Sequence, residues 1–309
     1  MRKIIGIGET ILDIIFKNGQ PSAAVPGGSV FNCIVTLARL GLHTEFISEV
    51  GKDPVGELIQ HYMQDNGIST EYLDIYAENK SPISLAFLND QHDAKYSFYK
   101  NYPEFRLQVG LPNIEENDIV IIGSYYSVTP ALREKHVELL SMAKEKHAIV
   151  FYDLNFRYPH KNEAIKLAPY IIENFEFADI VRGSEEDFMC LYNLCDAEKI
   201  YKDKIKFYCS NFIYTAGAKD ACLQTNNLTK SYPVKPLEAV STVGAGDNFN
   251  AGLIYGLFKQ DITAEALYQM SEAQWDGAIS YAQQFAAEAC MSYDNSISKE
   301  VLQQKGWII

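Results

Sequence analysis

The sequence predicts one α/β domain in which a mainly parallel sheet is covered by helices on both faces. Short apolar runs bounded by turn residues alternate with helical patterns, as is typical of buried parallel strands. A hairpin with a polar turn interrupts this alternation once. Because no internal repeat, low-complexity tract or linker divides the chain, a single domain is expected to span residues 1–309.

The expected elements follow from these patterns in chain order. Apolar strands are expected at residues 4–8, 43–50, 118–123, 148–153, 179–181, 212–215 and 221–224. Helices are expected at residues 27–40, 54–66, 130–146 and 162–175, and a long helical stretch from 250 to about 291. Gly41 and Gly67 follow the first two helices as stop signals. Asp53 and Pro54 are the N-cap and first-turn residue of the second helix.

The interruption is a candidate lid. Residues 84–88 and 96–100 are strand-like and flank the polar segment 89–93, so they predict an antiparallel hairpin. A hairpin inserted in a parallel chain suggests a lid over a ligand crevice or a dimer contact. We expect a discontinuous lid formed by about residues 11–17 and 82–102.

Composition limits the function classes. The net charge of −13 argues against nucleic acid and against anionic membranes as main partners, although backbone N–H groups can still bind phosphate locally. Six scattered cysteines without a C-x-x-C pattern suggest a reducing compartment. Glu9 and Asp13 interrupt the N-terminal apolar run too soon for a secretory signal, and no stretch is long enough to span a membrane. A cytoplasmic protein is expected.

The strongest chemical motif is a glycine-rich turn before a predicted helix. Gly244, Ala245 and Gly246 expose unpaired backbone N–H groups at a helix N-terminus, where the helix dipole favours a phosphate. Asp247 follows directly, and its carboxylate could accept a proton from a substrate hydroxyl. The alternative is that Asp247 only caps the helix and the glycines only form a tight turn.

Two other nucleotide motifs are excluded. Gly6 and Gly8 follow the first strand, but Ile11 occupies the place of the third glycine of a dinucleotide-binding fingerprint. No G-x-x-x-x-G-K-[ST] sequence occurs, so the chain has no P-loop.

Two segments together resemble a known family. The N-terminal segment Pro-Gly-Gly-Ser-Val-Phe-Asn at 26–32 precedes Gly41 and Gly51, and the C-terminal segment 244–247 lies about two hundred residues later. Both resemble signatures of the ribokinase-like (PfkB-type) carbohydrate kinases, most like fructokinases, over essentially the whole chain. The resemblance implies a ribokinase-like three-layer α/β/α sandwich with a mainly parallel central sheet and a small β-sheet lid. It also implies an ATP-dependent sugar kinase that uses Mg²⁺, a phosphotransferase with an alcohol group as acceptor.

The resemblance assigns the first roles at the sugar and phosphate ends. Asp247 becomes the catalytic base, and the amides of 244–246 form the anion hole. Substrate-binding positions are Asp13, Gly27, Gly28, Asn32, Lys100 and Arg157. Without the resemblance, Asn32 is interpreted as a hydrogen-bonded buried amide, and Arg157 as a member of a surface ion pair.

The resemblance also assigns the nucleotide and metal ends. Thr215 and Gly217, with Gly244 and Gly246, match nucleotide-binding positions, whereas the adenine pocket is left unassigned. Ser184 and Asp187 stand where the family binds magnesium through water. They equally fit an N-cap serine followed by acidic first-turn residues.

Departures from the family pattern leave the substrate open. Ser241 replaces an acid that often helps to bind a monovalent cation, so potassium activation is not implied. Lys100 stands where fructose-using members commonly have Arg, and Arg106 is a candidate substitute. Fructose is the first substrate expected and a keto-deoxy sugar acid the next; another sugar or a nucleoside is an alternative. A catalytically weak sugar-binding or regulatory protein is the alternative of another class. A homodimer through the lid is a further expectation.

Overall fold

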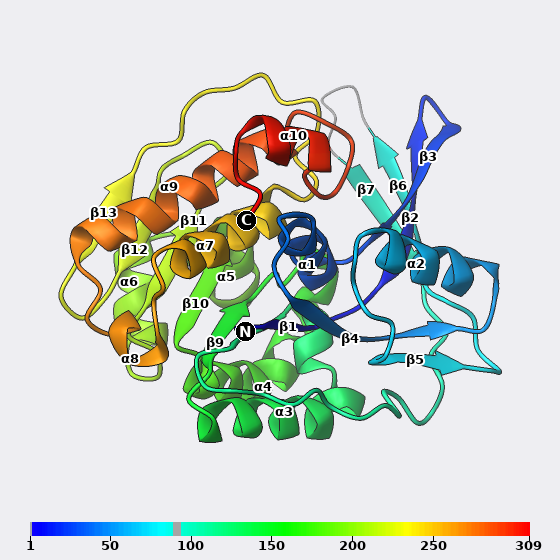
Figure 1. Ribbon diagram of the computed structural model, residues 1–309, viewed down its shortest axis with the longest axis horizontal. Helices are drawn as coiled ribbons and strands as arrows, with labels where there is room; N and C mark the ends of the chain where they lie inside the picture. The colour runs from blue at the N-terminus through cyan, green and yellow to red at the C-terminus, as the bar shows by residue number, and fades with distance from the viewer. Residues whose placement is uncertain (1, 89–93) are drawn as a thin grey trace.

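The computed structural model describes residues 2–88 and 94–309 and has a central sheet between two helical layers (Figure 1). In spatial order the sheet contains β13 (Thr229–Tyr232), β12 (Ala221–Gln224), β11 (Phe212–Thr215), β10 (Ile180–Ser184), β9 (Ile149–Asp153), β8 (Ile119–Gly123), β1 (Ile4–Ile7), β4 (Thr44–Gly51) and β5 (Leu73–Tyr76). The strands from β11 to β5 are parallel, and β12 and β13 are antiparallel additions at one edge. The carboxyl ends of the parallel strands therefore meet at one edge of the sheet, where ligands bind in such folds.

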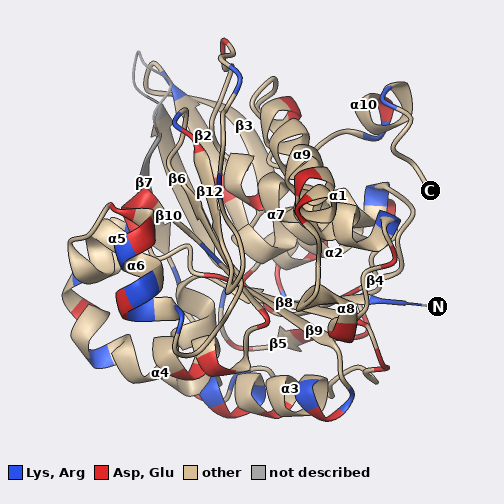
Figure 2. Cartoon of the chain, turned by 90° about the vertical axis from the view of Figure 1, so that its left-hand side faces the viewer, with Lys and Arg blue, Asp and Glu red and all other residues tan. Residues whose placement is uncertain are grey.

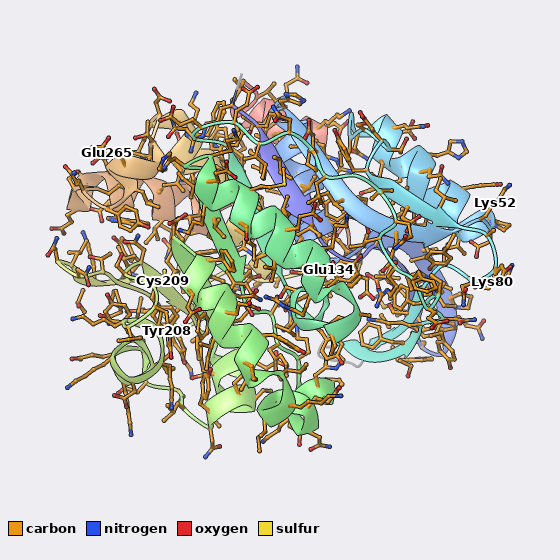
Figure 3. The ribbon with its side chains drawn as sticks, turned by 90° about the horizontal axis from the view of Figure 1, so that it is seen from below. Lys52, Lys80, Glu134, Tyr208, Cys209 and Glu265 are labelled. Atoms are coloured by element: carbon orange, nitrogen blue, oxygen red, sulfur yellow. The ribbon has the colours of Figure 1, made fainter. Side chains whose placement is uncertain are left out.

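Helices cover both faces, which confirms the predicted three-layer α/β/α arrangement. One face carries α1 (Ser29–Arg39), α2 (Pro54–Asp65), α7 (Ala245–Lys259) and α9 (Glu272–Ala289). The other carries α3 (Arg133–Glu145), α4 (Ala164–Phe177) and α5 (Glu185–Tyr192). Figure 3 shows α3 and α4 side by side across that face. Three short helices complete the described chain: α6 (Ala197–Ile200), α8 (Ala264–Leu267) and α10 (Lys299–Gln304).

The core consists of two apolar layers, one on each face of the sheet. Successive strand residues point to opposite faces, so Ile4 packs in the α1/α7 layer and Ile5 in the α3/α4 layer. Val120 and Ile121 of β8 divide in the same way. Because both faces are buried, the strands read as continuous apolar runs rather than as alternating ones.

A separate four-stranded sheet forms the lid. Its order is β3 (Gln20–Gly27), β2 (Ile11–Lys17), β6 (Ile83–Leu88) and β7 (Ala94–Tyr99). β2 runs parallel to β6 and antiparallel to β3. The sequence did not predict β3, which is mostly exposed and contains Pro21 and Pro26. The predicted polar turn at 89–93 lies outside the described residues.

Two other expectations needed correction. The long helical stretch to residue 291 is divided into α7, α8 and α9, with Asp261 in a left-handed conformation (φ +51°) after the first. The helix expected from residue 27 begins at Ser29, because Gly27 ends β3 and Gly28 is the N-cap with φ +140°. β3 therefore leads directly from the lid into α1.

Candidate active site

The N-terminus of α7 opens the site. Gly244 is its N-cap with φ +78°, a conformation that favours glycine. A Cβ on Gly244 would lie 2.5 Å from the carbonyl oxygen of Asn295, so a larger residue has no room. In the described chain no side chain caps this end of α7. The backbone N–H of Ala245 donates to the carbonyl oxygen of Thr242 at 3.3 Å, so the amides of Gly246 and Asp247 are the first-turn donors available to an anion.

Asp247 lies in the first turn of this helix and does not serve as its cap. Its Oδ2 accepts a hydrogen bond from Nδ2 of Asn32, at 2.7 Å, and the residue is 9% exposed. Burial is the main cause that raises the pKa of Asp247 to about 6, with the Asp153 carboxylate adding to the effect. The Asn32 hydrogen bond and the cations Arg157 and Arg182 act against this shift. A base with a pKa near 6 is ionised at neutral pH and can accept a proton.

Asp13 lies on β2 of the lid, and its side chain extends toward Asn295. Its Oδ1 accepts a hydrogen bond from the Ser84 hydroxyl, and its Oδ2 accepts one from Nδ2 of Asn295, at 3.2 Å. Burial is the largest cause that raises the pKa of Asp13 to about 6. A Cβ on Gly27 would lie 2.5 Å from Oδ2 of Asp13, so glycine is needed for this approach. The predicted residues Asp13 and Gly27 are therefore neighbours.

Asn295 connects the two halves of the site. Its side chain donates to Asp13, and its carbonyl oxygen accepts from Nδ2 of Asn248, at 2.9 Å, beside Gly244. The lid carboxylate and the glycine turn are thus fixed to one residue of the loop after α9. Only the fold brings Asn295 to this place, and its sequence surroundings carry no motif.

Glu9 and Lys100 form an ion pair beside the sugar-binding positions. Nζ of Lys100 lies 2.8 Å from Oε2 of Glu9, and the Tyr102 hydroxyl donates to Oε1. A Cβ on Gly28 would lie 2.0 Å from the Glu9 carbonyl oxygen, so this backbone approach requires glycine. Lys100, predicted to bind substrate, is therefore held by a carboxylate that the sequence interpretation did not include.

The nucleotide-side residues lie beyond the glycine turn. Thr215 ends β11, and its hydroxyl oxygen accepts a hydrogen bond from Nη2 of Arg182, at 2.6 Å. Gly217 follows in a left-handed turn (φ +59°) with open space around its Cα. Thr215 thus ends a strand and Gly217 follows it at the carboxyl edge of the sheet, where a nucleotide loop is expected.

Ser184 and Asp187 form a capping box at the start of α5. Oδ2 of Asp187 accepts from the backbone N–H of Ser184 (2.6 Å) and from its hydroxyl (2.7 Å). Oδ1 accepts from the backbone N–H of Phe156 at 2.6 Å. Among the described residues, no group of three or more His, Cys, Asp or Glu side chains could enclose a metal ion. The capping alternative is therefore present, and metal binding through water stays a prediction.

Arg157 lies in an exposed ion pair. Its Nη1 is 2.8 Å from Oε2 of Glu186, and both side chains are about half exposed. The surface alternative from the sequence thus describes its present contact. Arg157 still lies close enough to Asp247 to lower the pKa of that carboxyl group.

A buried polar network under the glycine turn escaped sequence reasoning. Nη1 of Arg182 lies 2.9 Å from Oδ1 of Asp153, and Oδ2 of Asp153 accepts from Nδ2 of Asn250, at 2.8 Å. Asp153 ends β9, and Arg182 lies opposite it in the middle of β10. A charged residue at or just after an apolar run was the signal available for both.

Comparisons with known proteins show the family and the fold of the chain. A family model described as pfkB family carbohydrate kinase matches residues 1–300. Probable fructokinase-4 of Arabidopsis thaliana is 25% identical over 269 residues, 81% of each chain. The 5-dehydro-2-deoxygluconokinase of Clostridium botulinum is 29% identical over 291 residues, 89% of this chain and 82% of that protein. Fructokinase of Vibrio cholerae, crystallised with fructose, ADP and calcium, has a TM-score of 0.83 at 22% identity, covering 100% of this chain and 99% of the other.

Proposed function

The chain belongs to the pfkB family of carbohydrate kinases, and from this premise we propose that it transfers the γ-phosphate of ATP to a hydroxyl of fructose or a closely similar neutral sugar. The observation that carries the proposal is the 2.7 Å contact between Asp247 and Asn32. It joins the carboxylate at the phosphate-binding turn to the helix that follows the lid. A weak sugar-binding protein has no need for a buried base at this place.

The proposed mechanism uses residues at both ends of the crevice. Asp13 and Asn32 bind sugar hydroxyls, since carboxylate and amide groups accept from and donate to a polyol. Asp247 accepts the proton of the attacking hydroxyl. The amides of 244–246 stabilise the negative charge that develops on the transferring phosphoryl group. The lid excludes water, which limits hydrolysis of ATP.

Kinases of this family use Mg²⁺-ATP. Thr215 and Gly217 are the proposed nucleotide contacts, and Ser184 with Asp187 the proposed contacts to water around magnesium. Bound with ATP, the ion supplies positive charge at the phosphates. Because both oxygens of Asp187 already accept protein hydrogen bonds, we propose no direct bond from this residue to the metal.

Charge pairing favours a neutral sugar over a sugar acid. The carboxylate of Glu9 lies 2.8 Å from Nζ of Lys100 and balances its charge. Likewise, Nε of Arg106 donates to the carboxylate of Glu49 at 2.8 Å. Arg106 also stacks on Tyr102, whose hydroxyl donates to Glu9, so the two pairs form one network. A carboxylate on the substrate would compete with Glu9 for Lys100, at the cost of leaving one anion unpaired. The 5-dehydro-2-deoxygluconokinase relative makes a sugar acid the substrate to test against.

The test is a sugar panel in an ADP-release assay, run on the wild type and on Glu9→Gln. Fructose should give the highest kcat/KM, and the keto-deoxy sugar acid should be at least tenfold poorer, a difference of about 1.4 kcal/mol. Glu9→Gln should leave Lys100 available to the carboxylate of the sugar acid, so the ratio of the kcat/KM values for fructose and the sugar acid should fall about tenfold. Glu134→Gln is the matched control, because Glu134 is exposed on α3 (Figure 3). ADP release that no sugar stimulates would refute the kinase.

The setting of the enzyme is also proposed. All six cysteines are free, as in a reducing compartment, which supports a cytoplasmic location. Within the described residues every helix is too short or too polar to cross a membrane. Figure 2 shows acidic and basic residues interspersed on α3 and around α5. The net charge of the chain is −13. Nucleic acid is therefore not a proposed partner. A homodimer is proposed to form through the outer face of the lid, which carries the aromatic residues Phe16, Phe87 and Tyr99.

A further inference from the structure

Arg182 is a buried cation at the centre of the phosphate end of the site. It belongs to β10, lies opposite Asp153 in the parallel register, and is 7% exposed. Nη1 binds Oδ1 of Asp153 at 2.9 Å, and Nη2 donates to the Thr215 hydroxyl at 2.6 Å. One side chain in the middle of β10 therefore contacts the last residues of both neighbouring strands, β9 and β11.

The guanidinium group packs directly against the glycine turn. A Cβ on Gly246 would lie 3.2 Å from both Nη1 and Nη2 of Arg182. The guanidinium group thus lies next to the first turn of α7, where it adds positive charge at a place that the helix dipole already makes favourable for an anion. The centroid of the Phe249 ring lies 5.9 Å from the guanidinium carbon, so this ring of α7 limits the movement of the guanidinium group on the helix side.

Arg182 also carries a buried donor without a partner. In the part of the chain that the structure describes, Nε of Arg182 is buried and makes no hydrogen bond. A buried unpaired donor on a charged group is costly, so this arginine is a poor choice for packing alone. A cation placed here is better explained by a negatively charged ligand at the turn above it.

We propose that Arg182 is a positioning residue for phosphoryl transfer, which fixes Asp153 and Thr215 and holds positive charge beneath the Gly244–Gly246 turn. This inference rests on the proposed function. It assigns to β10 a role that the glycine turn was expected to carry alone.

The proposal predicts opposite effects of the two partners on the catalytic base. The groups that face Asp247 are Asn32 and Cys33 of α1, Asp153 of β9, Arg157 of the following loop, and Arg182. Asp153 raises the pKa of Asp247, and Arg182 lowers it. Loss of the Asp153 charge should therefore move the acid limb of the pH–rate profile to lower pH, and loss of the Arg182 charge should move it to higher pH.

The experiment measures kcat, the KM for ATP and the pH–rate profile for the wild type, Arg182→Met, Arg182→Lys and Asp153→Asn. Arg182→Met should lower kcat at least about tenfold and move the acid midpoint to higher pH, while the KM for sugar changes less than twofold. Asp153→Asn should move the midpoint to lower pH. Arg182→Lys keeps the charge, so its midpoint should stay near that of the wild type, with kcat between those of the wild type and Arg182→Met.

Three outcomes decide the proposal. Opposite shifts of the midpoint support it, because loss of packing alone would move both variants in the same way. Unmoved or parallel shifts in folded, active variants overturn it. If Arg182→Met does not fold, Arg182→Lys decides the question. A lysine variant with the kcat of the wild type, and with its affinity for Mg-ADP in calorimetry, would show that the two guanidinium hydrogen bonds to Asp153 and Thr215 are dispensable, and this would overturn the proposal. Failure of the wild type to phosphorylate any sugar would instead overturn the proposed function, and the calorimetric comparison of Mg-ADP binding would still test Arg182.

Discussion

At the scale of single residues, Asp247 combines a proposed catalytic role with a cost in stability. Its carboxyl group has a pKa of about 6 in the fold, above its ordinary value near 3.8, because it is buried. The ionised form is thus disfavoured by folding, so this group weakens the fold increasingly as the pH rises from its ordinary pKa to about 6, and by a constant amount above that. The penalty disappears as the pH falls toward the unfolded value. The proposed role of Asp247 as a base beside the glycine turn accounts for a stability cost of this kind.

Asp247→Asn should therefore lose activity and gain stability. Turnover should fall at least about 10²-fold, the scale of a lost general base, while sugar and Mg-ADP still bind. Stability at pH 8 should rise, by at most about 3 kcal/mol, because the amide carries no charge to desolvate. Kinetics, calorimetry and thermal unfolding measure the three effects. Asp65→Asn, on the exposed side of α2, should change none of them. Near-normal turnover of Asp247→Asn would contradict the assignment.

The pH dependence follows from the same carboxyl group. Activity of the wild type should fall as the pH drops through about 6, because protonated Asp247 cannot accept a proton. Asp13 also has a raised pKa of about 6, so the KM for sugar should increase over the same range if its ionised form binds a hydroxyl. A pH–rate profile of kcat and of kcat/KM separates the two groups. A flat profile between pH 5 and 8 would exclude Asp247 as the base.

At the scale of elements, the turn before α7 can be separated from ordinary glycine strain. Gly244 has φ +78° and a backbone neighbour 2.5 Å from the place of a Cβ. Gly67, after α2, has φ +77° and no atom within 4 Å of that place. Both alanine variants should lose about 1 kcal/mol from the left-handed conformation. Gly244→Ala should lose more, and its kcat at least about tenfold. Equal effects in unfolding and kinetics would show that the turn has no special role.

A second comparison tests the metal assignment at α5. Ser184 and Ser271 are both N-caps in capping boxes, with Asp187 and Gln274 as the partners at the third helical position. Alanine at either serine should cost about 1 kcal/mol in denaturant unfolding. Only Ser184→Ala should raise the Mg²⁺ concentration needed for half-maximal activity, if this cap also binds water of the metal. An unchanged Mg²⁺ requirement would leave the box as a helix cap alone.

The elements differ in how much of them sequence reasoning could predict. The apolar strands were predictable because burial on both faces leaves an uninterrupted apolar run. β3 was not, because its residues are exposed and its pairing with β2 depends on backbone contacts that any side chain allows. The same limit applied at the site. The glycine turn and Asp247 have a local signature, whereas Glu9, Arg182 and Asn295 act through contacts distant in sequence.

At the scale of the whole molecule, the lid has two different faces. Asp13 and Ser84 lie on the face toward the crevice, where they bond to each other. Phe16 and Phe87 lie an odd number of residues away, on the opposite face, where their rings stack with centroids 4.8 Å apart. Phe87 is 41% exposed, and Tyr99 on the same face is 58% exposed. Aromatic residues grouped on an outer sheet face are typical of protein contacts.

Phe87→Glu should therefore produce a monomer if two lids pack face to face, because a charge would be buried without a partner. Sedimentation velocity should give a dimer for the wild type and a monomer for this variant. Phe207→Glu is the matched control, since Phe207 is 89% exposed and follows α6 in the chain, away from the lid. It should leave the dimer intact. A wild type that stays monomeric at high micromolar concentration would refute the dimer, whereas a dimer that Phe87→Glu leaves unchanged would place the contact on another surface. Because the inner face of the same sheet carries Asp13, the monomer should also bind sugar more weakly, and the KM for fructose measures this coupling between assembly and site.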